Sequence, residues 1–217
     1  MISWWKIAGF ILVLYSIILG ILGAVPNLPI LENSIRNLYF HVPMWFTMIA
    51  LLLFSFIKSI QTLNNKNVVN LKFDSEAEVY AKTALVFGIA GLCTGMIWAK
   101  NTWGAYWTND PKLNAAAVAM LLYAAYFVLR SSIDDEEKRA RISAVFNIFC
   151  FPIYIVLVFI LPRLTDSLHP GNGGNPGFNS YDLDSRLRMI FYPAVLGWIL
   201  IGFWIADIGK RIKNLSI

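Results

Sequence analysis

The chain has 217 residues, of which 58% are hydrophobic and only 14% are charged. Soluble domains carry about a quarter charged residues, so this composition, with a mean hydropathy of +0.60, excludes a soluble globular protein and indicates an integral membrane protein. The formal net charge of +5 does not predict a nucleic-acid partner. The basic residues are spread over the ends of apolar runs instead of forming one stripe or arm.

Six apolar runs are long enough, at roughly 20 residues each, to cross the hydrocarbon core of a bilayer. They are residues 4–25, 40–58, 79–98, 114–129, 142–161 and 189–208. The predicted fold is therefore all-α, a bundle of six transmembrane helices. We expect residues 1–217 to form a single membrane domain.

The distribution of positive charge predicts the orientation of the bundle. Twelve of the 18 lysines and arginines fall at one set of loops and ends, and six fall at the other. Because cytoplasmic loops carry the excess of Lys and Arg, both termini are expected in the cytoplasm. Segments 26–39, 99–113 and 162–188 then face outward.

Small residues recur at helical spacing on the third predicted span, at Ala84, Gly88, Gly91 and Gly95. Gly-x-x-x-Gly lets another helix approach closely in a membrane. We interpret this stripe as a helix-packing contact and not as part of a chemical site.

The chain has only two histidines, and both fall near the outward end of the bundle. His41 precedes Pro43, a residue that suits the first turn of a helix, so His41 is expected where the second span leaves the outer interface. His169 precedes the Gly/Asn-rich stretch 171–177, which predicts a flexible turn region, so His169 is expected to be poorly fixed. A neutral imidazole at either place can act as a metal ligand.

Two metal-centred ligands are compatible with this pair of histidines. Iron held by two histidines is common for b-type haem. Zinc usually requires a third or fourth protein ligand, which Asp110 or Asp166 could supply, so zinc stays open. A covalently attached c-type haem is not predicted, because the chain contains no C-x-x-C-H motif.

An aromatic segment separates the third and fourth spans, with the sequence Trp103-Gly104-Ala105-Tyr106-Trp107-Thr108-Asn109-Asp110-Pro111. Its three large rings offer flat apolar surface with polar groups at the edges. Interface aromatics are normally scattered over helix ends, whereas these cluster in one connecting segment, which favours stacking on a flat ligand such as haem. Asp110 followed by Pro111 predicts the N-cap and first-turn proline of the fourth span.

The two propionates of haem require cationic partners. Arg36, five residues before His41, is the leading prediction, since a guanidinium can bind a carboxylate through two hydrogen bonds. Arg186 and Arg188 are weaker predictions, because snorkelling at the membrane interface is the better explanation for them.

With these features in place, the chain resembles the CcmC family of haem-handling membrane proteins in cytochrome c biogenesis. The resemblance is carried by Arg36 with His41-Val42-Pro43, by Trp103-Gly104-x-Tyr106-Trp107-x-x-Asp110, and by the second outer histidine, His169. With six spans it covers nearly the whole chain. The chain departs from the family at Asn109, where an aromatic residue is usual, and in the long loop after His169.

The resemblance implies a haem-delivery protein and not an enzyme. His41 and His169 would be the axial ligands of haem b, and the haem-presenting segment would comprise Trp103, Gly104, Tyr106, Trp107 and Asp110. Segments 26–43, 99–113 and 162–188 would bind haem on the periplasmic side of the cytoplasmic (inner) membrane. The implied partners are a periplasmic haem chaperone of the CcmE type, the ABC-type complex CcmAB and the small membrane protein CcmD.

Two other functions remain as alternatives. A haem lyase or cytochrome c synthase of the CcsA type shares the tryptophan-rich segment, but those proteins typically have more spans and a second histidine pair. A small-molecule transporter would require polar or broken helices near the bilayer midplane, and Pro152 is the main break of that kind here.

Overall fold

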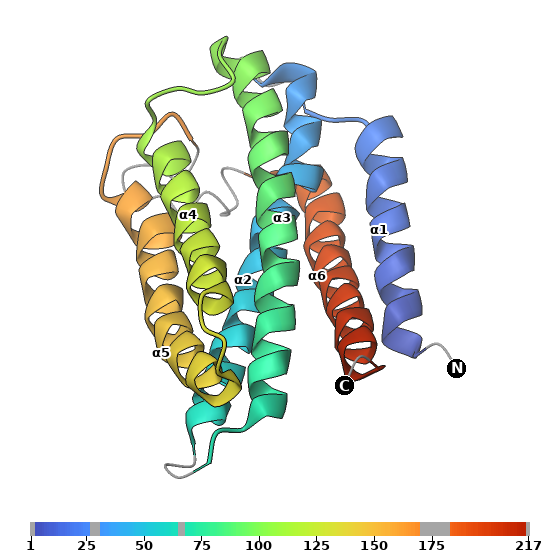
Figure 1. The fold of residues 1–217 in the computed structure, drawn as a ribbon. Coiled ribbons are helices and arrows are strands. Elements are labelled where there is room, and N and C mark those ends of the chain that lie inside the picture. Colours follow the sequence, from blue (N-terminus) through green and yellow to red (C-terminus); the bar gives the residue numbers. More distant parts are fainter. Residues whose placement is uncertain (1–2, 27–30, 65–67, 170–182, 216–217) are drawn as a thin grey trace.

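The computed structural model describes residues 3–26, 31–64, 68–169 and 183–215 (Figure 1). Within these ranges it contains no strand and six helices that are long and apolar enough to cross a membrane. They are α1 (Trp4–Leu22), α2 (Leu38–Leu63), α3 (Leu71–Trp103), α4 (Pro111–Ser131), α5 (Glu136–Ile155) and α6 (Ser185–Leu215). The predicted all-α, six-span membrane fold is confirmed.

The helices form a bundle with α2 and α3 at its centre (Figure 1). α4 and α5 lie on one flank, and α6 and α1 lie on the other, where α1 packs mainly against α6. The N- and C-termini lie at the same end of the bundle. Both termini therefore share one side, as predicted, while the assignment of that side to the cytoplasm stays a prediction.

Local sequence explains where the helices next to the aromatic segment end and begin. α3 ends at Trp103, and the next residue, Gly104, has a φ of 83°, a left-handed conformation that favours glycine. α4 begins after Asp110, whose carboxylate accepts hydrogen bonds from two amides in the first turn, with Pro111 as the first helical residue. The predicted cap and first-turn proline are confirmed.

The predicted third span, residues 79–98, lies inside α3, which runs from Leu71 to Trp103 because flanking polar residues continue the helix at both ends. One predicted helix start was wrong. Pro43 does not open α2. A short 3-10 helix, η1 (Glu32–Asn37), leads directly into α2 at Leu38, so the backbone is already helical when it reaches Pro43.

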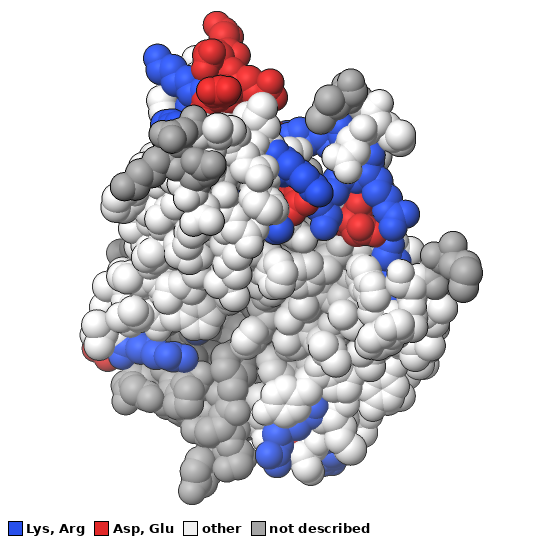
Figure 2. Space-filling view, turned by 90° about the horizontal axis from the view of Figure 1, so that it is seen from below, with Lys and Arg blue, Asp and Glu red and all other residues white. Residues whose placement is uncertain are grey.

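A buried ion cluster joins α3 to α4 at the end of the bundle that carries the termini. Arg130 contacts Asp74 through two hydrogen bonds of 2.7 and 2.5 Å, and its guanidinium lies 3.2 Å from Glu78. Lys213 of α6 also pairs with Glu78. Figure 2, which views this end, shows acidic and basic side chains in adjoining groups on an otherwise largely uncharged surface.

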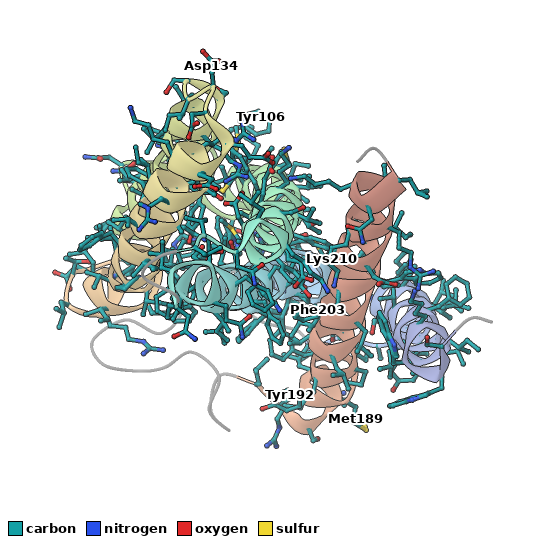
Figure 3. All side chains as sticks on the ribbon, turned by 60° about the horizontal axis from the view of Figure 1, so that its bottom comes forward. Tyr106, Asp134, Met189, Tyr192, Phe203 and Lys210 are labelled. Carbon is teal, nitrogen blue, oxygen red and sulfur yellow. The ribbon has the colours of Figure 1, made fainter. Side chains whose placement is uncertain are left out.

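α6 packs on the centre of the bundle partly through Tyr80 of α3. Lys210 donates a hydrogen bond of 3.0 Å to the Tyr80 hydroxyl, and the Phe203 ring lies 5.9 Å from the Tyr80 ring. In Figure 3, Lys210 and Phe203 lie on the side of α6 that faces the central helices, while Met189 and Tyr192 lie toward its other end.

Candidate functional site

One pocket brings both histidines together, at the end of the bundle opposite the termini. Its walls come from α2, α3, the start of α4 and the end of the fifth span, where α5 continues into a π-helical segment, η2 (Val156–Ile160), and a 3-10 turn, η3 (Leu161–Arg163). π-helical segments occur frequently at functional sites. The polar and aromatic residues that line the pocket are His41, Trp45, Phe46, Trp98, Trp107, Lys112, Phe159, Arg163, Ser167 and His169.

His41 extends from the first turns of α2 onto the face of α3. Its Nδ1 lies 2.9 Å from the Gly91 carbonyl oxygen and 3.2 Å from the Thr94 hydroxyl. A carbonyl can only accept, so Nδ1 carries the hydrogen and Nε2 is the unprotonated nitrogen. The glycine stripe predicted as a helix contact is indeed where α3 meets α2, but Gly91 and Gly95 admit the side chains of Trp45 and His41 there.

His169 is held by Asp110, which corrects the expectation that this histidine is poorly fixed. Its Nδ1 lies 3.0 Å from an Asp110 carboxylate oxygen. The other carboxylate oxygen accepts from the Ser167 hydroxyl at 2.8 Å and from the Leu168 amide at 2.7 Å. The turn that carries His169 is therefore fastened to the start of α4. The Gly/Asn-rich stretch 171–177 lies outside the described residues.

The protonation states of this pair follow from their surroundings. Burial alone would raise the pKa of Asp110, but the hydrogen bonds from His169, Leu168 and Ser167 hold that pKa well below its usual range. Burial lowers the pKa of His169, and the hydrogen bond to Asp110 offsets this only in part. His169 is therefore neutral at pH 7 and donates through Nδ1, so its Nε2 is also unprotonated.

The aromatic wall differs from the predicted one. Of the three predicted rings only Trp107 lines the pocket, together with Trp45 and Trp98, which the sequence reasoning missed. Trp103 instead contacts the edge of the His169 ring, with centroids 4.7 Å apart. Tyr106 is 56% exposed and is absent from the lining, as is Gly104.

The two missed tryptophans carried a signal in the sequence. Trp45 is four residues after His41, so both side chains lie on one face of α2. Trp98 follows Gly91 at a spacing of seven residues, which places it on the face of α3 that His41 contacts. Asn109, in the aromatic segment, accepts a hydrogen bond from the Asn114 side chain.

The cations at the pocket also differ from the prediction. Arg36 donates hydrogen bonds to the carbonyls of Gly20 and Gly23, at 2.9 and 2.7 Å, and so completes the C-terminal end of α1. Arg36, Arg186 and Arg188 do not line the pocket. Lys112 and Arg163 line it instead. Both residues belong to the outward-facing segments predicted from the charge distribution, but no feature of the sequence assigned them to the site.

The donor set suits a ligand that needs two imidazoles and a broad apolar wall. Among the described residues, no group of three or more His, Cys, Asp or Glu side chains could hold a metal ion. Asp110, one proposed third zinc ligand, already accepts hydrogen bonds on both of its oxygens. Iron in a porphyrin requires only two axial nitrogens from the protein, and indole rings and cations surround the two that this pocket offers.

A known family matches the part of the chain that contains this pocket. Residues 2–169, which include both histidines and the whole aromatic segment, match the family described as Cytochrome C assembly protein. The chain belongs to that family. The resemblance predicted from the sequence is confirmed at this level.

Individual relatives carry two names. A "Heme exporter protein C" from Bradyrhizobium diazoefficiens is 30% identical over 120 residues, which are 53% of this chain and 43% of the relative. A "Cytochrome c biogenesis protein CcsA" from Prochlorococcus marinus is 31% identical over 112 residues, 49% of this chain and 36% of the relative. These two matches span less than half of either relative. A "Heme exporter protein C" from Escherichia coli K12 is 25% identical over 226 residues, 100% of this chain and 84% of the relative.

Proposed function

We propose that this protein binds haem b between His41 and His169 at the outer face of the cytoplasmic membrane and presents it to a periplasmic haem chaperone of the CcmE type during c-type cytochrome biogenesis. The observation that carries the proposal is the pair of histidines that line one pocket, each with Nδ1 hydrogen-bonded. Each Nε2 lone pair is thereby left for a metal.

The remaining residues of the pocket have roles in the same proposal. Bound haem would offer its iron to the two imidazoles and its propionates to cations. Lys112 and Arg163 are the cations that line the pocket, and they replace Arg36 as the proposed propionate partners. Trp45, Trp98 and Trp107 supply flat apolar surface. Trp103 supports the His169 ring from its edge, and Tyr106 stays exposed for contact with a partner.

The proposed partners are those of a haem-exporter system. The Escherichia coli relative named Heme exporter protein C aligns with the whole of this chain, which supports an arrangement with CcmAB, CcmD and a CcmE-type chaperone. Residues 26–43, 99–113 and 162–188 would then form the periplasmic face of a single membrane domain. In this role the protein positions haem and does not itself catalyse a reaction.

Similarity to CcsA favours a second candidate function, a haem lyase or cytochrome c synthase component. Such a protein would itself join haem to apocytochrome c. The two functions differ in the acceptor, which is a haem chaperone in the first case and an apocytochrome in the second. Incubation of the haem-loaded protein with each acceptor, followed by haem staining after denaturing electrophoresis, separates them.

The first experiment is an absorption spectrum of the detergent-purified protein, oxidised and reduced, beside His41→Gly and His169→Gly. We expect a six-coordinate b-type spectrum in the wild type. Each variant should lose one axial ligand, and added imidazole should restore the six-coordinate spectrum because it fills the space that the side chain left. Tyr192→Phe, on the exposed face of α6, is the matched control. A wild type that takes up no haem, or variants with its spectrum, would refute the proposal.

A further inference from the structure

His41 rests on a small surface of α3. This surface consists of Gly91, Thr94 and Gly95, and we call it the His41 seat. The imidazole Nδ1 faces the Gly91 carbonyl oxygen at 2.9 Å and the Thr94 hydroxyl at 3.2 Å. The seat therefore provides two oxygen atoms to the nitrogen that would not bind iron.

Hydrogen-bond directions in the seat determine which nitrogen carries the proton. The Thr94 hydroxyl donates its hydrogen back to the helix, with the Ala90 carbonyl at 2.8 Å and the Gly91 carbonyl at 3.0 Å. Its lone pairs, like those of the Gly91 carbonyl, are then directed at Nδ1. Both groups accept from the same N–H, so they favour the tautomer of His41 that carries its hydrogen on Nδ1 and leaves Nε2 unprotonated.

Space in the seat determines where the ring lies. A Cβ atom at Gly95 would stand 2.7 Å from Cε1 and 3.2 Å from Nδ1 of His41. The ring cannot easily move away, because Trp45 and Trp98 pack edge-on against it with centroids 6.4 and 5.8 Å distant. A methyl group at position 95 must therefore displace the imidazole or the helix.

We propose that Gly95 and Thr94 are positioning residues for His41, Gly95 by admitting the ring and Thr94 by fixing its tautomer and plane. The inference rests on the proposed function, because it concerns His41 as an iron ligand. Thr94 does not line the pocket, whereas Gly95 does and acts through the position of the His41 ring. A metal-binding histidine usually has its second nitrogen held in this way, and loss of such a partner commonly lowers metal affinity by about 10- to 100-fold.

The test compares haem-loaded wild type with Gly95→Ala, Thr94→Val and Thr94→Ser in detergent. The readouts are the coordination state of the ferric iron, by absorption and electron paramagnetic resonance, the midpoint potential and haem affinity. Gly95→Ala should convert the six-coordinate low-spin iron largely to a five-coordinate or mixed state. Thr94→Val should lower haem affinity by about tenfold, because the Gly91 carbonyl remains. Thr94→Ser keeps the hydroxyl and should match the wild type.

Gly88→Ala is the matched control for Gly95→Ala. It adds the same methyl group to α3 about two turns earlier, where the nearest atoms are the flexible ends of Met120 and Met48. The positioning role of the His41 seat is refuted if Gly95→Ala and Gly88→Ala give the same coordination state. It is also refuted if Thr94→Val and Thr94→Ser have the same haem affinity. If Gly95→Ala does not fold, the comparison of haem affinity between Thr94→Val and Thr94→Ser tests the proposal by itself. A wild type without haem would instead refute the proposed function, and the inference with it.

Discussion

The Asp110 carboxylate lies 3.0 Å from Nδ1 of His169 while it also caps the first turn of α4. One side chain thus joins a helix start to a loop that follows the fifth span, 59 residues further along the chain. Asp110 is only 3% exposed, so its charge is shared among the donors around it and not with water.

Asp110→Asn should separate the two tasks of this residue. Asn caps helices as well as Asp does, so the start of α4 should be retained, but the Asn NH2 cannot accept from the Leu168 amide, so thermal stability should fall modestly. The amide carries no charge and is a weaker acceptor for the His169 N–H, so haem affinity should fall about tenfold. Asp110→Ala should lose the cap as well and cost about 1 kcal/mol of stability. Haem titration beside thermal unfolding measures both effects, and equal haem affinity in wild type and Asp110→Asn would contradict this account.

Lys112→Gln and Arg163→Gln should each weaken haem binding, since a charge-assisted hydrogen bond contributes about 1.5 kcal/mol, which corresponds to about tenfold in affinity. Arg36→Gln should leave haem affinity unchanged and lower stability by about 1 kcal/mol, because its partners are the carbonyls at the end of α1. Haem titrations and thermal unfolding of all three variants measure this. The opposite pattern, with haem affinity lost only in Arg36→Gln, would identify Arg36 as the propionate partner in place of Lys112 and Arg163.

Arg130→Ala should destabilise the fold by about 3 kcal/mol or more, because it leaves the buried carboxylates of Asp74 and Glu78 without this partner. The haem spectrum of the surviving folded protein should be unchanged, since the cluster lies at the other end of the bundle from the pocket. Arg139→Ala is the control, because the Arg139 side chain is 29% exposed whereas that of Arg130 is 7% exposed. Thermal unfolding in detergent gives the comparison, and a stability equal to that of Arg139→Ala would show that the cluster contributes nothing.

The orientation of the bundle can be tested with cysteines in a variant whose two native cysteines are replaced by alanine. Tyr106→Cys should react with a membrane-impermeant maleimide added to intact cells from which the outer membrane has been removed. Asp134→Cys, in the connection between α4 and α5, should react only after the membrane is permeabilised. Mass-shift electrophoresis reads both reactions. The reverse pattern would place both termini outside and overturn the charge-bias prediction.

The sequence by itself determined the features that depend on local chemistry. Six apolar runs predicted the six helices, because bilayer thickness sets the length of a span. Asp110 and Pro111 predicted the start of α4, because capping involves only neighbouring residues. The two histidines and the aromatic segment were enough to indicate the family, although their ligand roles remain predictions.

Only the tertiary structure decided which side chains share the pocket. Arg36 was expected at the site and lies at the end of α1, whereas Lys112 and Arg163 line the pocket from different helical segments. The space for the His41 ring depends on Gly95, 54 residues later in the chain. The position of His169 is fixed by its hydrogen bond to Asp110. Spacing within one helix predicts which residues share its face, but the rotation and depth of packed helices follow from contacts between distant parts of the chain.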